Sequence, residues 1–329
     1  MKSPHIAVFL LAFFALNLFY IANLFAGQVI FWGYGIDGNI SPSLYSSGVV
    51  VMDGEVLTNA IAIAAGKMHA LAIRSDSTVV GWGYNNKGQA TGVPTAGPTV
   101  GVVKLDGQIL SNVVAVAAGV SSSLALKSDG TVVSWGMQMA GNKMHTTVGL
   151  SNVVSIADGL FGITVTSDGS VFNTRGDQYK TLSNVVAIAI QTGSGGGNVV
   201  RAIALKNDAT VVESVLDHDD PPVTVGVSNA VAVSAGGLPK LALKRDGTVF
   251  GWNDGSNVPG GLSNVVAISA GSRHSLALKK DGTVTMWGYY RPQALAVPEG
   301  LSNVVAVAAG NDFFLAITTN RAVAEKFRH

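Results

Sequence analysis

The chain of 329 residues contains no cysteine, and only 12% of its residues are charged. The absence of cysteine excludes disulfide bonds, thiolate zinc sites and cysteine nucleophiles. Lysine and arginine total 21, against 20 aspartate and glutamate residues, so the formal net charge is +1. A chain this close to neutrality has no general attraction for polyanions, and we expect no nucleic-acid partner.

What the chain has in abundance is repetition. The segment SNVVAVAAG at residues 111–119 recurs in near copies that begin at Thr58, Ser151, Ser183, Ser228, Ser263 and Ser302. The spacing ranges from 32 residues, between Ser151 and Ser183, to 53 residues, between Thr58 and Ser111. Repeats of this length are typical of solenoids, arrays and propellers.

Each copy is followed by two more apolar segments that Asp-Gly or a degenerate form of it joins, as in SLALKSDGTVVSWG at residues 123–136. Asp-Gly between two β-rich runs is a strong hairpin signal because both residues tolerate positive φ. The first segment is apolar on both faces, which is typical of a strand between two layers. We therefore expect antiparallel meanders whose first strand is the most buried.

The two ends of the chain complement each other. Residues 27–35 correspond to the third segment alone, whereas the last repeat, at residues 302–317, supplies the first two. If the N-terminal strand completes the last sheet, the ring closes and no free sheet edge remains. The predicted fold is all-β: a seven-bladed β-propeller of four-stranded antiparallel blades over residues 27–321, closed by the N-terminal strand, with a tail at residues 322–329.

Residues 1–26 form a separate element. Lys2 precedes a run at residues 6–25 that is almost entirely apolar, and Ala26 followed by Gly27 offers a cleavage point. The pattern predicts an export signal peptide, and hence a secreted, periplasmic or cell-surface protein. The run of twenty residues is also long enough to cross a bilayer, so an uncleaved anchor is the alternative. We favour cleavage, because the first predicted strand follows without a linker.

The pattern NVVAVAAG–xxHSLALKxDGTVxxWG resembles the regulator-of-chromosome-condensation repeat, a family of seven-bladed propellers. His69 and His274 stand at the recurrent histidine of that family. Its recurrent tryptophan is matched by Trp82, Trp135, Trp252 and Trp287. Residues 82–94 and 287–310 are similar to the exported bacterial branch that includes the second-type β-lactamase inhibitor protein.

The resemblance implies a platform that binds another protein without chemistry. Nuclear members of the family are exchange factors for a small GTPase and bind chromatin. This chain differs from them in its export signal, its near-zero charge and the absence of a basic tail. It also lacks the Trp-Gly pair at residues 172–176 and 211–215.

No motif in the chain predicts an enzyme, a metal site or a cofactor. His69 and His274 could be read as catalytic or metal-binding, but other repeats place serine, proline or phenylalanine there, so the position is structural. The run GSGGG at residues 193–197 lacks the Lys-Ser/Thr of a phosphate loop. The acidic run at residues 217–220 lacks the ligand spacing of a calcium loop.

Antiparallel order places the loops after the first and third strands on one rim, and the Lys-x-Asp-Gly turns on the other. The repeats differ most in those loops, which are rich in residue types common at protein interfaces. We expect a partner to bind through this set: Tyr34, Tyr84, Asn85, Met137, Phe161, Arg273, Tyr289, Tyr290, Arg291 and Phe313.

The leading functional hypothesis is an exported, monomeric, non-catalytic propeller that binds another protein through this aromatic-rich face. One alternative is a carbohydrate-binding or polysaccharide-active envelope protein, with a surface glycan as its ligand. The other is a structural module of a surface assembly. We expect contact with a membrane only if the N-terminal segment is uncleaved.

Overall fold

The computed structural model describes residues 26–33, 46–137, 145–191, 200–216, 218, 220–253, 257–288, 296–320 and 322. Residues 1–25 of the predicted export signal and nearly all of the predicted tail lie outside these residues. So do four of the predicted binding residues: Tyr34, Tyr289, Tyr290 and Arg291. No helix in the described part of the chain is long and apolar enough to cross a membrane.

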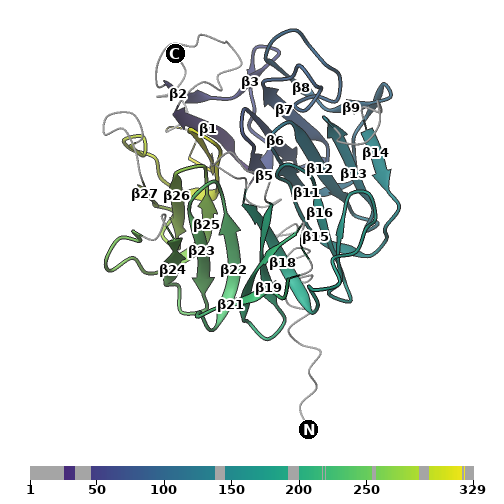
Figure 1. Ribbon diagram of the computed structural model, residues 1–329. Helices are drawn as coiled ribbons and strands as arrows, with labels where there is room; N and C mark the ends of the chain where they lie inside the picture. Colours follow the sequence, from purple (N-terminus) through teal and green to yellow (C-terminus); the bar gives the residue numbers. More distant parts are fainter. Residues whose placement is uncertain are drawn as a thin grey trace.

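The all-β prediction is confirmed, because the described elements are strands in antiparallel sheets (Figure 1). Sheet 1 consists of β5 (Ala60–Ala65), β6 (His69–Arg74), β7 (Val79–Gly83) and β8 (Thr99–Val102). Sheet 2 consists of β11 (Val113–Ala118), β12 (Ser122–Lys127), β13 (Val132–Gly136) and β14 (His145–Val148). Sheet 3 consists of β15 (Val153–Ala157), β16 (Ile163–Thr166) and β17 (Val171–Asn173).

The second half of the chain repeats this order. Sheet 4 consists of β18 (Val185–Gln191), β19 (Arg201–Lys206), β20 (Val211–Val215) and β21 (Val223–Val225). Sheet 5 consists of β22 (Ala230–Ala235), β23 (Lys240–Lys244) and β24 (Val249–Trp252). Sheet 6 consists of β25 (Val265–Ala270), β26 (His274–Lys279) and β27 (Val284–Gly288).

Sheet 7 combines the two ends of the chain. It consists of β28 (Val304–Ala309), β29 (Phe313–Thr318), β1 (Gln28–Gly33) and β2 (Ser46–Val49). β1 pairs antiparallel with β29 from Gln28 opposite Thr318 to Gly33 opposite Phe313. The N-terminal strand therefore takes the third place in the last sheet, between β29 and β2.

Two short hairpins lengthen the connections to the first and second sheets. β3 (Val51–Met52) pairs with β4 (Glu55–Val56), and β9 (Lys104–Leu105) pairs with β10 (Gln108–Ile109). Their Asp-Gly turns have positive φ at both residues, as a tight hairpin requires. The second hairpin accounts for part of the 53-residue spacing between Thr58 and Ser111.

Not every sheet reaches the four strands that the sequence predicts. Sheets 3, 5 and 6 have three strands within the described residues. In sheet 3 the cause is length, because β17 ends at Asn173 and β18 already begins at Val185. In the segment between β17 and β18, the strand pairing that the structure describes is an isolated bridge between Phe172 and Gln178.

The prediction that the first strand is the most buried is wrong. The second strands β6, β12 and β26 are buried at every residue but the last, whereas most residues of the first strands β5 and β11 are partly exposed. The first strands contact one another in cyclic order and surround a central cavity. A second strand has strands on both sides and sheets on both faces, so it loses more contact with water than an inner strand.

The Ser-Asn pair that opens each repeat has a role that the sequence analysis did not assign. Six of these asparagines have φ between 51° and 59°: Asn112, Asn152, Asn184, Asn229, Asn264 and Asn303. Asparagine adopts this left-handed conformation more readily than most residues. The Asn112 carbonyl then accepts a hydrogen bond from the Ser128 amide at 2.8 Å, which ties the start of β11 to the hairpin turn after β12.

Candidate functional site

The loops after the first and third strands leave the sheets at the same end, as the strand order predicts. In sheet 2, Ala118 at the end of β11 pairs with Ser123, and Gly136 at the end of β13 pairs with Ser122. The Met137 amide also donates to the Ser121 carbonyl at 2.8 Å, so the two loops are joined. We call the rim formed by the described parts of these loops the AAG rim.

Backbone hydrogen bonds between neighbouring sheets hold the AAG rim together. The Lys67 amide donates to the Gly119 carbonyl at 2.9 Å, and the Val120 amide donates to the Gly159 carbonyl at 2.9 Å. A Cβ at Gly66 would lie 2.5 Å from the Gly119 carbonyl oxygen. The recurrent glycine is therefore needed because the next loop approaches its Cα closely, and the rim is a fixed frame for side chains.

Three of the predicted binding residues are exposed on the AAG rim. Met137 is 52% exposed, Tyr84 is 36% exposed and Arg273 is also exposed, while Phe161 is half-buried. The exposed side chain of Leu160, outside the predicted set, lies beside Phe161 in the loop after β15. Its signal is weak in the sequence, because one leucine in a divergent loop does not show whether it is exposed.

Two of the predicted binding residues point inward, and their assignment to a partner contact is corrected. Asn85 has no exposed surface: its Nδ2 donates to the Val93 carbonyl at 2.7 Å and its Oδ1 accepts from the Ala90 amide at 2.8 Å. Phe313 is 2% exposed and packs in a core cluster that includes Trp82. The Asn85 side chain makes hydrogen bonds inside its own loop, and the Phe313 ring lies in a core. Neither side chain can therefore reach a partner.

His69 belongs to an uncharged network between sheets 1 and 2. Its Nε2 lies 2.8 Å from Ser123 Oγ, which donates to the Gln89 carbonyl at 2.8 Å, and Trp135 Nε1 donates to the same carbonyl at 3.0 Å. Because the serine proton goes to Gln89, the proton between His69 and Ser123 belongs to His69 Nε2. Burial lowers the pKa of His69 to about 4, so the ring is neutral at pH 7.

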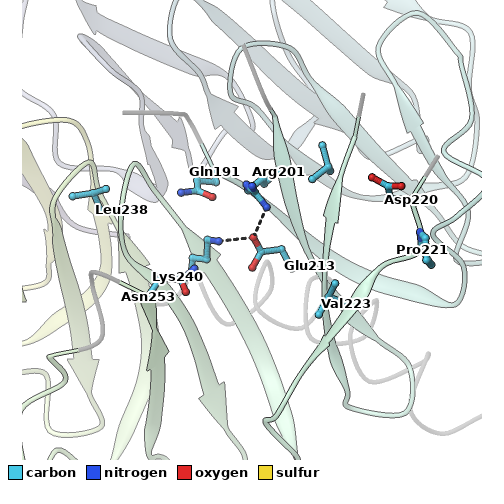
Figure 2. Close-up of a pocket in the computed structure, with 10 residues that line it drawn as sticks. Gln191, Arg201, Glu213, Asp220, Pro221, Val223, Leu238, Lys240 and Asn253 are labelled. Carbon is cyan, nitrogen blue, oxygen red and sulfur yellow. Dashed lines mark hydrogen bonds and ion pairs between the residues drawn. The ribbon is translucent and has the colours of Figure 1, made fainter. Parts of the chain in front are cut away.

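The equivalent place between sheets 4 and 5 is charged and hollow. Lys240 Nζ donates to Glu213 Oε1 at 2.6 Å, and Arg201 Nη1 donates to the same oxygen at 3.3 Å. Figure 2 shows both cations directed at this carboxylate. A cavity of about 690 Å³ adjoins the three side chains, and we call it the Glu213 pocket. Its remaining lining residues are Gln191, Val215, Asp220, Pro221, Val223, Leu238 and Asn253.

Strand register places the Glu213 side chain between sheets 4 and 5. Ser214 pairs with Ala202 as Trp82 pairs with Ala70, so a serine occupies the place of the recurrent tryptophan, on the face of β20 toward sheet 3 and away from the pocket. Glu213, one residue earlier, occupies the place of Gly81 and faces the next sheet. The side chains of Arg201, Leu238 and Asn253 come from the ends of strands or loops at the AAG rim, so the pocket opens on that rim.

The central cavity, of about 330 Å³, also opens on the AAG rim. Five alanines and Ile190 line it, together with the charged residues Lys67, Asp158 and Arg273. Burial raises the pKa of Asp158 to about 7, although the carboxylate accepts a hydrogen bond from Ser122 Oγ at 3.0 Å. In the described ranges, no three histidine, aspartate or glutamate side chains are grouped as metal ligands.

The opposite rim satisfies its own charges. In the turn after β12, Asp129 Oδ1 accepts from the Thr131 amide at 2.9 Å and from Thr131 Oγ1 at 2.6 Å. Lys127 Nζ lies 3.9 Å from the same carboxylate. Lys244 and Lys279 make the same pairs with Asp246 and Asp281 at 3.4 and 3.7 Å. In the part of this rim that the structure describes, these lysines and aspartates pair within their own turns.

Three segments of the chain, residues 60–89, 113–138 and 265–289, match the Regulator of chromosome condensation (RCC1) repeat. The chain is also similar to the probable E3 ubiquitin-protein ligase HERC6 of Homo sapiens, with 30% identity over 175 residues. The match covers 46% of this chain and only 16% of HERC6.

Solved structures agree with this match at the level of fold. Prp20p from Saccharomyces cerevisiae has a TM-score of 0.69 at 18% identity, over 91% of this chain and 93% of its own. Human WBSCR16 has a TM-score of 0.67 at 17% identity, over 90% and 100% of the two chains. The CRINKLY WD40 ectodomain of the Arabidopsis thaliana receptor kinase ACR4 has a TM-score of 0.56 at 16% identity, over 78% and 91%. The fold is that of an RCC1-like β-propeller.

Proposed function

We propose that this protein is a non-catalytic member of the RCC1-repeat propellers and binds another protein through the AAG rim. The observation that carries the proposal is the asymmetry of the two rims. Both cavities and the exposed side chains of Met68, Tyr84, Met137 and Leu160 lie on the AAG rim. The opposite rim pairs its charges within its own turns. A fixed surface with apolar anchors binds at a low cost in conformational entropy.

The relatives support the class of function. The structure of Prp20p was described together with its binding to Gsp1p and histones, and a second structure of Prp20 contains Kap60. Gsp1p, histones and Kap60 are proteins, and they are partners of Prp20. For the present chain we propose a protein partner of unspecified identity. A polyanion is a poorer candidate, because the net charge is +1.

The proposal includes one closed propeller of seven blades, with residues 1–26 as an export signal that is removed. Cyclic contacts among the seven first strands support closure, as does the pairing of β1 with β29. Deleting residues 27–33 would then expose the edge of β29, and we expect aggregation or a much lower melting temperature. An unchanged melting temperature in a monomeric product would contradict closure by β1. Sequencing the N-terminus of the exported protein tests cleavage after Ala26.

Partner binding is tested by capturing the partner from the exported fraction with residues 27–329 and measuring its affinity for rim variants. Tyr84→Ala and Met137→Ala should weaken binding, by about thirtyfold where the side chain is a hot spot of about 2 kcal/mol. Neither should lower the melting temperature, because both side chains are exposed. Lys244→Ala and Lys279→Ala on the opposite rim are the controls and should change neither quantity.

Other outcomes would separate the alternatives. Loss of binding in the lysine variants alone would move the functional face to the opposite rim. Glycans retained on an array, with no protein captured in stoichiometric amount, would favour the carbohydrate-binding alternative. A large assembly captured through either rim would favour a structural module.

A further inference from the structure

The inner end of the Glu213 pocket carries more positive than negative charge. One carboxylate, that of Glu213, is shared by two cations, Lys240 and Arg201. The Lys240 side chain is only 3% exposed, and its ammonium contacts Glu213 at 2.6 Å. The Arg201 side chain is 45% exposed, and its guanidinium has five N–H donors. Arg201 can therefore offer donors to a ligand in the pocket while it stays beside Glu213.

Stability alone does not account for this triad. Ion pairs removed from water gain little over well-packed apolar side chains, because desolvation offsets their attraction. The uncharged network of His69, Ser123 and Gln89 joins sheets 1 and 2 at the equivalent place. Between sheets 4 and 5 the charges border a cavity that opens on the AAG rim, which is where a ligand would meet them.

We propose that the Glu213 pocket binds a carboxylate of the protein partner, carried by an aspartate or glutamate side chain, with Arg201 as its direct donor. Arginine donates two parallel hydrogen bonds to a carboxylate, which gives both affinity and orientation. Val215, Val223 and Leu238 would contact the methylene groups of the incoming side chain. The assignment of the carboxylate to a protein rests on the proposed function.

The other polar residues of the pocket limit which ligands it can bind. Asp220 and Pro221 lie at the end away from Lys240 (Figure 2), and the Asp220 side chain would repel a second carboxylate. One of the two N–H donors of Gln191 Nε2 is already used, because it donates to the Gly237 carbonyl at 2.9 Å. The pocket is thus suited to a single acidic group, held at the Arg201 end.

The carboxylate site is tested without a partner. The full exported chain is titrated with N-acetylglutamate methylamide, and with the glutamine analogue as its uncharged match, while amide NMR signals are followed. We expect the glutamate probe to shift the signals of Val215, Leu238 and Asn253, and the glutamine probe to leave them. Arg201→Gln should weaken the glutamate probe about tenfold or more, as loss of a charged hydrogen bond does. Arg245→Gln, which removes an exposed arginine from the opposite rim, should not weaken it.

Four results would contradict the proposed carboxylate site. Two concern the NMR signals: equal shifts with the glutamate and glutamine probes, or shifts confined to Lys67 and Arg273 at the central cavity. The other two are an unchanged affinity of Arg201→Gln for the glutamate probe, and no shift of the pocket signals at probe concentrations up to about 100 mM.

A second arm identifies the source of the carboxylate. Arg201→Gln should weaken the captured protein partner at least as strongly as it weakens the probe. If the probe binds in the pocket but the partner binds Arg201→Gln normally, the carboxylate comes from a small molecule and the assignment to a protein is wrong. Because the first arm needs no partner, failure of the rim proposal and failure of the pocket proposal give different results.

Discussion

Two contacts between neighbouring sheets occupy equivalent positions and differ in chemistry. The neutral interface, between sheets 1 and 2, is closed by His69, Ser123 and the Gln89 carbonyl. The charged interface, between sheets 4 and 5, holds Arg201, Glu213 and Lys240 beside a cavity of about 690 Å³. The same fold therefore accepts either a filled contact or a hollow one at this place.

The difference follows from the loop after the third strand. In sheet 1 this loop is built around the buried Asn85, and it places the Gln89 carbonyl between Ser123 and Trp135. At the charged interface the tryptophan equivalent to Trp135 is retained as Trp252, whose Nε1 lies 3.5 Å from Glu213 Oε2, and the loop after β20 contributes Asp220 and Pro221 to a pocket wall. Because this loop forms the wall of a pocket instead of placing a carbonyl between the two sheets, space remains, and the charges line it.

The largest expected effect comes from removing the shared carboxylate of the charged interface. Glu213→Gln leaves the buried Lys240 ammonium without a counter-charge, and we expect a loss of about 3 kcal/mol in the free energy of unfolding. Urea denaturation measures it. Adding Lys240→Met to Glu213→Gln should recover most of the loss, because the unpaired charge is then gone. A small effect of Glu213→Gln, equal to that of Lys244→Gln on the opposite rim, would mean that the triad is effectively solvated.

Much of this comparison could be predicted from the sequence, and some could not. The repeats gave the strand order, the hairpin turns and the shared end of the loops, because these depend on local periodicity and on Asp-Gly. The loss of Trp-Gly at residues 211–215 was visible as well. The position of the Glu213 pocket was not, since Glu213 and Lys240 meet only when two sheets pack face to face.

The sequence did contain a signal that was not used. Glu213 interrupts the apolar run VVESV, and Lys240 stands where four other repeats have alanine or serine and the last has Phe314. Two opposite charges at positions that carry uncharged residues in those repeats, in consecutive repeats, indicate an ion pair across the sheets. The sequence did not predict that the side chains of Asn85 and Phe313 point inward. Both residue types are as common in interfaces as in loops and cores.

The second-largest expected effect is a loss of stability at the AAG rim of the neutral interface. A Cβ at Gly66 would lie 2.5 Å from the Gly119 carbonyl oxygen and 2.8 Å from His69 Cε1. Gly66→Ala must therefore displace the rim of the neutral interface, at a cost of about 2 kcal/mol in unfolding free energy. Gly149→Ala is the matched control, because its Cβ would have no atom within 4 Å. Equal denaturation curves for both variants would show that the rim is not held closely there.

The smallest effect uses pH, and the part of it that depends on His69 belongs to the neutral interface. Burial holds the pKa of His69 at about 4, below its ordinary value of 6.5, so the unfolded chain binds the proton first as pH falls. The contribution of neutral His69 to stability is complete above pH 6.5 and is lost as pH falls from there toward 4. Between pH 7.5 and 5.5 we expect the wild type to lose about 1 kcal/mol relative to His69→Gln, since Asp158 and His274 titrate alike in both proteins.

Arg201→Gln supplies the contrast, because Arg201 belongs to the charged interface and lies outside the His69 network. This variant should show the same dependence of stability on pH as the wild type, measured by denaturation at each pH value. If His69→Gln retains the wild-type loss, the proton enters elsewhere. His274 is then the first residue to test, since burial also lowers its pKa and its ring packs edge-on against Phe314 at 4.9 Å.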